Sequence, residues 1–192
     1  MFAQKLETAE RLVQSATEAL LRAGAILPSE VDGAATAIYA TDAAGVLTYF
    51  NAACIGLAGR KPAAGQDRWC VTWKLYTEDG EMLPHDRCPM AVAIRERRRV
   101  RGLAAIAERP DGTRRGFLAC PTPLVDASSA FVGAVNALVE LSFVELAAFH
   151  QDQAEKCHRL AMAVNDTFTI ETMLRLAREF EAKARCYRAL HA

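Results

Sequence analysis

A chain of 192 residues is long enough for one domain with helical extensions. Its composition, with 52% hydrophobic and 24% charged residues, is typical of a globular protein that buries a core. The 23 basic residues are balanced by 23 acidic ones, which disfavours nucleic acid or an anionic membrane as the main partner, because both select a basic excess. The chain has no apolar run of membrane-spanning length and no apolar N-terminal stretch of the signal-peptide kind, so we expect a cytoplasmic protein whose six cysteines are reduced.

Residues 3–27 are predicted to form a helix, which Pro28 ends, and residues 29–36 to form a linker. The helix carries a heptad repeat of apolar residues in which alanine alternates with larger side chains. Such a repeat serves either to pack the helix on its own domain or to form a parallel seam between two copies, and both alternatives stay open. The repeat consists of Leu6, Ala9, Val13, Ala16, Leu20, Ala23 and Leu27.

The stretch 38–51 predicts a β-hairpin followed by a helix. Two β-prone runs, 38–41 and 46–50, are joined by a turn in which Asp42 can bond its own backbone and Gly45 supplies a positive φ. Asn51 follows at once and is a favoured N-cap residue, so we expect a helix over 52–58 that begins at this side chain.

The later elements are predicted from strand runs, turns and helical periodicity. A helix is expected over 90–98, with Pro89 in its first turn, followed by strands over 100–109, 114–121 and 131–141. From about residue 143 the apolar period becomes helical, with a polar break at 165–167, which predicts an antiparallel helical hairpin. The expected total is five strands in an antiparallel order, two before the helices and three after.

The order of these features resembles a PAS domain over residues 35–141. The matching residues are Thr41-Asp42 with Gly45, Asn51-Ala52-Ala53, Gly59, Trp69, Asp79-Gly80, Pro84 with Cys88-Pro89, Arg109-Pro110-Asp111-Gly112, Pro123-Leu124 and Gly133. The resemblance implies an α+β fold, with a PAS-like five-stranded antiparallel sheet, helices on one face, and a small-molecule or partner site between them. We therefore expect three segments: an N-terminal amphipathic helix and linker (1–34), the PAS domain (35–142) and a C-terminal helical hairpin (143–192).

Two features depart from well-known PAS proteins. The Asn-Cys-Arg-Phe-Leu-Gln motif of PAS domains that bind flavin covalently does not occur, and about fifty residues follow the last strand, too few for a kinase, cyclase or full DNA-binding output domain. His150 and His158 lie on a predicted helix, which suggests a phospho-acceptor, although neither is followed by the acidic residue or basic pair of such sites. The alternative is an exposed helix histidine.

The candidate site residues fall between the predicted sheet and helices. Trp69, Trp73, Tyr76, Met90 and Phe117 are expected to line an apolar pocket, with Asn136 as its polar anchor, unless they are plain core.

Histidine and cysteine offer two further candidate sites. His85 precedes the long helix, where haem-binding PAS domains place their proximal ligand, so haem ligation competes with an ordinary loop histidine. His85 and Cys88, with Cys70 and Cys120, could bind a metal, but only one close ligand pair exists and buried cysteines commonly act as small apolar residues.

No phosphate loop, nucleophile elbow, catalytic triad order or pair of catalytic carboxylates is present in the sequence. We therefore predict a non-enzymatic PAS-type sensory or adaptor protein of bacterial signal transduction. It would act through a homodimer, a histidine kinase or another signalling protein. A small-molecule ligand is a further option, and the sequence does not identify a cofactor. The alternatives are a haem-binding gas or redox sensor and a PAS-linked histidine-kinase fragment.

Overall fold

The computed structural model describes residues 2–22 and 29–189, which divide into two compact units, one from Ala3 to Glu140 and one from Leu141 onward. Leu27 and Pro28, where the first helix was expected to end, lie outside the described residues. No helix within the described ranges has the length and apolar character needed to cross a membrane.

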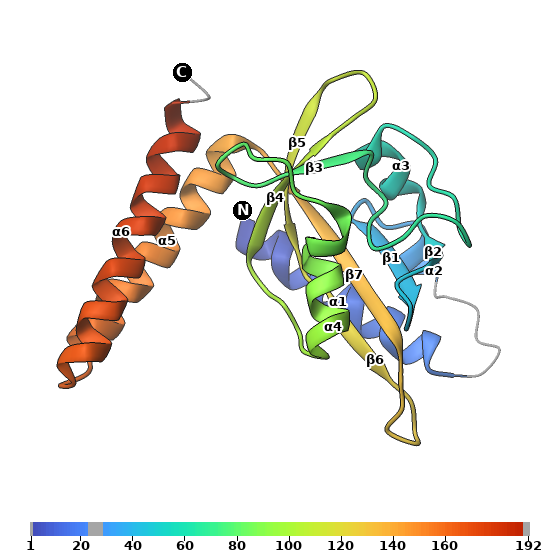
Figure 1. The fold of residues 1–192 in the computed structure, drawn as a ribbon, viewed down its shortest axis with the longest axis horizontal. Coiled ribbons are helices and arrows are strands. Elements are labelled where there is room, and N and C mark those ends of the chain that lie inside the picture. Colours follow the sequence, from blue (N-terminus) through green and yellow to red (C-terminus); the bar gives the residue numbers. More distant parts are fainter. Residues whose placement is uncertain (1, 23–28, 190–192) are drawn as a thin grey trace. The chain divides into compact units, whose positions relative to one another are not determined.

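Figure 1 shows the elements in chain order. They are α1 (Phe2–Leu20), α2 (Ser29–Asp32), β1 (Ala37–Asp42), β2 (Leu47–Phe50), α3 (Ala52–Ala58), β3 (Lys74–Tyr76), the 3-10 turn η1 (His85–Arg87), α4 (Pro89–Glu96), β4 (Leu103–Glu108), β5 (Arg114–Ala119), β6 (Thr122–Val125), β7 (Phe131–Leu141), α5 (Phe143–Met162) and α6 (Thr167–Ala189). The α+β class is confirmed, and α2 is a helical turn inside the segment that was expected to be a linker.

The strands form one antiparallel sheet in the order β2-β1-β7-β5-β4-β3, with β6 also paired to β7. All five expected strands are present, and the described chain has two more. β6 follows β5 after a break at Cys120-Pro121. The strand is interrupted there because proline has no N–H to donate to the hydrogen bonds between strands. β3 is a three-residue edge strand, too short to carry an alternating pattern that sequence reasoning could detect.

The β1–β2 hairpin turn forms as the sequence predicts. The Asp42 carboxylate accepts the backbone N–H groups of Ala44 (2.9 Å) and Val46 (2.8 Å). Gly45 has φ +80°, and a Cβ at this position would lie 2.1 Å from the ring of Trp69. The glycine is therefore needed both for the backbone conformation and for the approach of the indole.

Asn51 occupies the expected N-cap position of α3, but its side chain makes no capping hydrogen bond. It is buried, and its Oδ1 accepts the N–H of Ile38 (3.0 Å) while its Nδ2 donates to the carbonyls of Val31 (3.0 Å) and Thr36 (2.9 Å). The expectation of a side-chain cap was wrong, because β1 and the segment before it offer this amide more partners than the helix end does.

The motif Arg109-Pro110-Asp111-Gly112 connects the β4–β5 hairpin to α3. Gly59 ends α3 in the left-handed conformation, and the Arg109 guanidinium donates to the carbonyls of Leu57 (3.2 Å) and Gly56. These donors satisfy carbonyls at the C-terminal end of the helix, which the helix itself leaves without partners.

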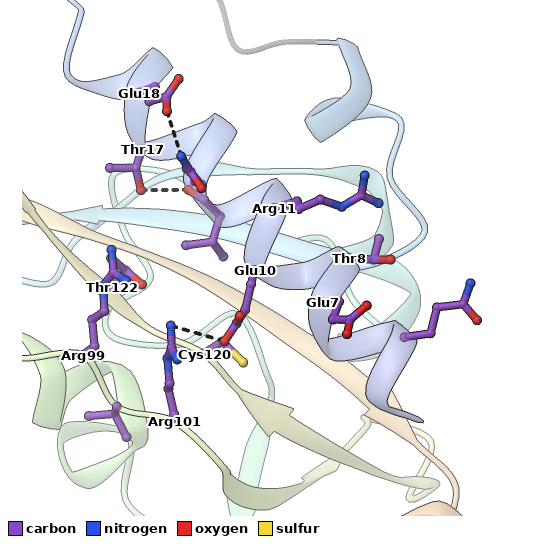
Figure 2. A pocket seen from close by; sticks show the side chains of 14 residues that line it. Glu7, Thr8, Glu10, Arg11, Thr17, Glu18, Arg99, Arg101, Cys120 and Thr122 are labelled. Carbon is purple, nitrogen blue, oxygen red and sulfur yellow. Dashed lines mark hydrogen bonds and ion pairs between the residues drawn. The ribbon is translucent and has the colours of Figure 1, made fainter. Parts of the chain in front are cut away.

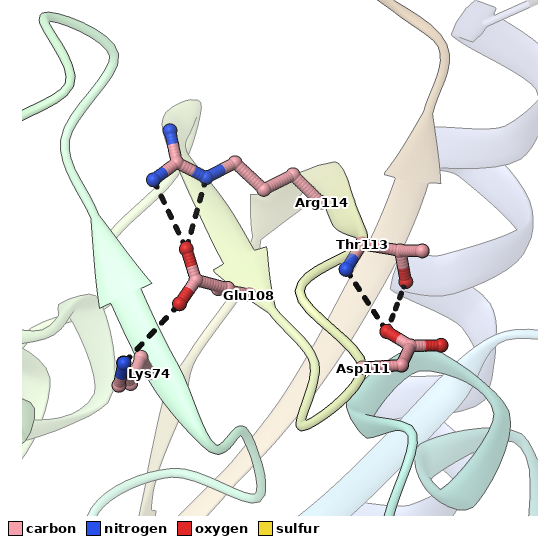
Figure 3. A network of polar contacts seen from close by, with 5 residues as sticks. All are labelled: Lys74, Glu108, Asp111, Thr113 and Arg114. Atoms are coloured by element: carbon pink, nitrogen blue, oxygen red, sulfur yellow. Dashed lines mark hydrogen bonds and ion pairs between the residues drawn. The ribbon is translucent and has the colours of Figure 1, made fainter.

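A polar network surrounds the turn of the same hairpin (Figure 3). One oxygen of Glu108 receives Nε and Nη2 of Arg114 at 3.1 and 3.0 Å, and the other receives Nζ of Lys74 at 3.3 Å. These donors, Arg114 first, lower the pKa of Glu108. Within the turn, Asp111 accepts the N–H (2.9 Å) and the hydroxyl (2.7 Å) of Thr113.

Helix α1 buries Ala9, Val13 and Ala16 of its apolar repeat within the first unit. It lies on the face of the sheet opposite to α4 (Figure 1), the face from which Leu118 and Val135 project. In this structure the repeat serves packing on its own domain, and a seam between two copies stays a prediction.

The second unit is the expected helical hairpin. Ser142 and Glu145 form a capping box at the start of α5, and His158 Nε2 lies 3.1 Å from Glu181 Oε1 across the pair of helices. His150 is buried, with its ring 5.7 Å from that of Tyr187 at an interplanar angle of 4°. The expectation of an exposed histidine is therefore wrong for His150, because the aromatic side chains of α6 cover it.

Candidate functional site

The interior between the sheet and helices α3 and α4 brings together four of the seven predicted site residues. Met90 and Phe117 are fully buried in the apolar core, and Trp69 packs against its edge. Asn136 faces the same interior from β7 and is 1% exposed. Whether these residues hold a ligand stays a prediction.

Trp73 and Tyr76 are not part of this interior. Trp73 is 51% exposed, and the ring of Tyr76 lies under the guanidinium of Arg114, 4.3 Å from the ring centroid. Leu75 lies between them in the sequence and is the residue of β3 that is buried in the core. Successive side chains of a strand point to opposite faces, so its neighbour Tyr76 points away from the core. The density of aromatic residues in the sequence did not reveal this alternation.

A chain of hydrogen bonds crosses the apolar core. Asn136 Nδ2 donates to the hydroxyl of Tyr39 (3.0 Å), and this hydroxyl donates to the carbonyl of Trp69 (3.0 Å). Asn136 Oδ1 accepts the N–H of Cys120 (2.9 Å), at the interruption between β5 and β6. Asn136 thus anchors a polar path inside the protein, in the position in which the sequence placed a polar anchor.

Two thiols continue this path. Cys88, at the N-terminus of α4, donates its S–H to the carbonyl of Trp69 over 3.7 Å, and Trp69 directly precedes Cys70. Cys70 accepts the hydroxyl of Thr72 (3.2 Å), which lies 3.4 Å from Nε2 of His85. We call Cys70, Thr72, His85 and Cys88 the thiol cluster.

Hydrogen bonding divides the acidity of the two thiols. The neighbouring Cys88 thiol and the hydrogen bond from Thr72 lower the pKa of Cys70 despite its burial, and the nearby imidazole of His85 acts in the same direction. The pKa of Cys88 is raised, first by the neighbouring Cys70 thiol and then by burial. Cys70 is therefore the thiol that carries negative charge first.

The backbone at the centre of this path is strained. Trp69 has φ +68°, a left-handed conformation that costs a residue with a Cβ roughly 1 kcal/mol. Its carbonyl accepts hydrogen bonds from both Tyr39 and Cys88, and these bonds hold the conformation in place.

His85 is half-buried on the turn η1, with its ring directed at Thr72. Haem ligation by this residue stays a prediction. Cys120 does not join the thiol cluster, because it lies near Glu10 and Arg101 at the opposite face of the sheet. Among the described residues, no group of three or more His, Cys, Asp or Glu side chains is arranged to hold a metal ion.

Sequence reasoning missed Tyr39 and Thr72. The side chains of β1 are buried on both faces of the sheet, so no alternation of apolar and polar residues marks the face on which Tyr39 lies. Its partner Asn136 sits opposite in the β1–β7 register, a pairing that joins distant parts of the chain and has no local signal.

A cavity of about 850 Å³ lies between α1 and the opposite face of the sheet (Figure 2). Most of the residues that line it are polar, and an ion pair of 3.3 Å between Arg101 and Glu10 connects the helix to the segment before β4. Cys120 and Thr122 line the cavity from the sheet side, so one end of the hydrogen-bonded path lies at the edge of this space.

The topology decides the fold family. β1 pairs directly with β7, so the two leading strands sit beside the trailing ones, while α3 and α4 cover one face of the sheet. This chain has the PAS fold.

Comparison with solved structures finds PAS and LOV domains. The LOV protein of Rhodobacter sphaeroides is 12% identical, with a TM-score of 0.44 over 94% of this chain and 98% of that one. The PAS domain of the fruit-fly ELK potassium channel is 14% identical, with a TM-score of 0.47 over 59% and 92%. The light-state dimer of the fungal blue-light photoreceptor Vivid is 14% identical, with a TM-score of 0.44 over 69% and 91%.

No protein-family model and no curated protein matches the chain. The solved PAS and LOV structures share too few residues with it to say what it binds.

Proposed function

We propose that this chain is a non-enzymatic sensory or adaptor protein that receives its signal inside the PAS core and transmits it through α1. The observation that carries the proposal is the hydrogen-bonded path from the thiol cluster through Tyr39 and Asn136 to Cys120. The path begins beside α4 and ends at the cavity under α1.

A path of this kind couples distant positions because its members are buried. A buried polar group that loses its hydrogen-bond partner costs about 1–3 kcal/mol. If the Trp69 carbonyl changes position, Tyr39 and Asn136 therefore rearrange rather than leave their polar groups without partners. A signal shifts such an equilibrium only if it binds or modifies one arrangement in preference to the other.

Helix α1 is suited to respond because the stripe that it buries, Ala9, Val13 and Ala16, consists of small side chains. Polar residues predominate among those that line the cavity beside it, and the ion pair between Glu10 and Arg101 is about half-exposed on both sides and contributes little to stability. Segments held by few buried apolar contacts open at low free-energy cost.

Displacement of α1 would expose two apolar surfaces together. One is the stripe of Ala9, Val13 and Ala16, and the other is the sheet face of Leu118 and Val135 that the helix now covers. Both suit a second copy of this chain or an amphipathic helix of a signalling partner such as a histidine kinase. The proposed output is therefore regulated association.

The test compares Tyr39→Phe with Tyr49→Phe. The first removes the hydroxyl at the centre of the path, while the second removes a hydroxyl that donates to Asp32 outside the core (3.0 Å). We expect Tyr39→Phe to accelerate amide hydrogen exchange throughout α1 and to change the chain count in native mass spectrometry, and Tyr49→Phe to do neither. Equal exchange of α1 in both variants would contradict the proposal.

A further inference from the structure

Cys70 and Cys88 come from separate segments, the loop before β3 and the N-terminus of α4, yet both lie in the same buried cluster. The Cys88 sulfur is 3.7 Å from the carbonyl oxygen of Trp69, the residue that directly precedes Cys70. The two thiols are 4% and 1% exposed, and both are free. The folding of the PAS core therefore holds two buried thiols beside each other.

We propose that Cys70 and Cys88 form a peroxide-reactive dithiol that closes to an intramolecular disulfide, with Cys70 as the attacking sulfur and Cys88 as the resolving one. This inference rests on the proposed function in one respect, since it assigns an oxidant as the signal that the PAS core receives. The chemistry itself is measurable on the isolated chain.

The surroundings of Cys70 fit the attacking role. Its sulfur accepts a hydrogen bond from the Thr72 hydroxyl (3.2 Å), which favours the thiolate, the reactive form, whereas the Cys88 S–H donates to the Trp69 carbonyl. Cys54 provides the contrast in the same core, because burial raises the pKa of its thiol to about 12. Thr72 acts here as a positioning residue.

The proposed reaction balances with hydrogen peroxide as the oxidant. The Cys70 thiolate attacks one peroxide oxygen, the O–O bond breaks, and a sulfenic acid and hydroxide form. Cys88 loses its proton to hydroxide, its sulfur attacks the sulfur of Cys70, the S–O bond breaks and a second hydroxide leaves as water. Two thiols and one peroxide become one disulfide and two waters.

The second step is favoured by the position of Cys88. The backbone N–H groups of Met90 and Ala91, in the first turn of α4, act to lower the pKa of this thiol against the effect of burial. Closure brings the two sulfurs to about 2.05 Å from each other.

His85 is the half-buried member of the thiol cluster, and Thr72 lies between it and Cys70, 3.4 Å from the imidazole Nε2 and 3.2 Å from the Cys70 sulfur. Disulfide closure removes the S–H that donates to the Trp69 carbonyl. The strained Trp69 backbone then keeps only the Tyr39 hydroxyl as donor, so oxidation acts directly on the path to α1.

The experiment uses the full chain with Cys186→Ser, which removes the exposed thiol. The reduced protein is treated with hydrogen peroxide, its remaining thiols are blocked, and it is digested with trypsin without reduction. We expect a disulfide that joins peptide 69–74 to peptide 88–95, each of which contains a single cysteine. The intact chain should lose the mass of two hydrogen atoms.

Thr72→Val tests the positioning role and Thr72→Ser is its matched control. The valine variant should form the disulfide about tenfold more slowly at about pH 5, below the Cys70 pKa of about 6, as for a pKa raised by one unit, and serine should restore the rate. Cys54→Ala should leave the rate unchanged. Free Cys70 and Cys88 after oxidation of other cysteines, or equal rates for valine and serine, would overturn the inference.

The same samples separate this inference from the proposed function. Failure of the disulfide to form rejects the dithiol and leaves the Tyr39 test of the proposed function standing. A disulfide that forms without changing amide exchange in α1 supports the dithiol and counts against transmission through that helix.

Discussion

Replacement of Asn51 by aspartate distinguishes two roles for this side chain. Asparagine and aspartate are about equally good N-cap residues, so a capping role predicts a change in unfolding free energy below about 0.5 kcal/mol. In the structure the Asn51 amide instead donates to the carbonyls of Val31 and Thr36 and accepts the N–H of Ile38. A carboxylate can keep only the last of these bonds.

The expected loss follows from this inventory. Two buried hydrogen bonds at about 1 kcal/mol each disappear, and two carbonyls then face a carboxylate that cannot donate, which adds a desolvation cost of similar size. We expect Asn51→Asp to lower the free energy of unfolding by about 3–5 kcal/mol, and Asn51→Ala by a comparable amount.

Urea unfolding followed by tryptophan fluorescence is a suitable assay, because the two tryptophans, Trp69 and Trp73, both lie in the unit that contains Asn51. The midpoint should fall in both variants with an unchanged m-value. An aspartate variant as stable as the unsubstituted chain would show that Asn51 acts as a cap and would refute its assignment as the link between β1 and the preceding segment.

Two further substitutions test the first unit. Gly45→Ala should lower the melting temperature clearly more than Gly80→Ala, because both glycines have positive φ but only at Gly45 would the added Cβ meet a side chain, 2.1 Å from the Trp69 ring. Glu108 has a lowered pKa in the folded chain, so its stabilising effect is complete above the unfolded value of about 4.3 and is lost as pH falls below it. Urea midpoints measured between neutral and acidic pH should therefore fall less for Glu108→Gln than for the unsubstituted chain, and parallel profiles would contradict this.

Local patterns were sufficient for most elements of the fold. The span of β7, Phe131–Leu141, matches its expectation, and the turn at Asp42 and Gly45 forms through the hydrogen bonds that its residue types predict. These features depend on residues close in sequence, whose conformational preferences act before any long-range contact forms.

The candidate site was predicted in part. Met90, Phe117 and Asn136 face the interior, whereas Trp73 and Tyr76 do not. Aromatic character alone cannot tell an inward from an outward position, because the phase of a three-residue strand depends on the strand with which it pairs.

Periodicities and turn preferences within short windows predict the succession of strands, turns and helices and the apolar stripe of the first helix. The folded chain adds that this stripe packs against its own sheet, that Tyr39 meets Asn136, and that the Cys88 thiol reaches the Trp69 carbonyl beside Cys70. Those contacts join residues far apart in the chain, and they exist only once strand register and helix docking have fixed which side chains share the interior.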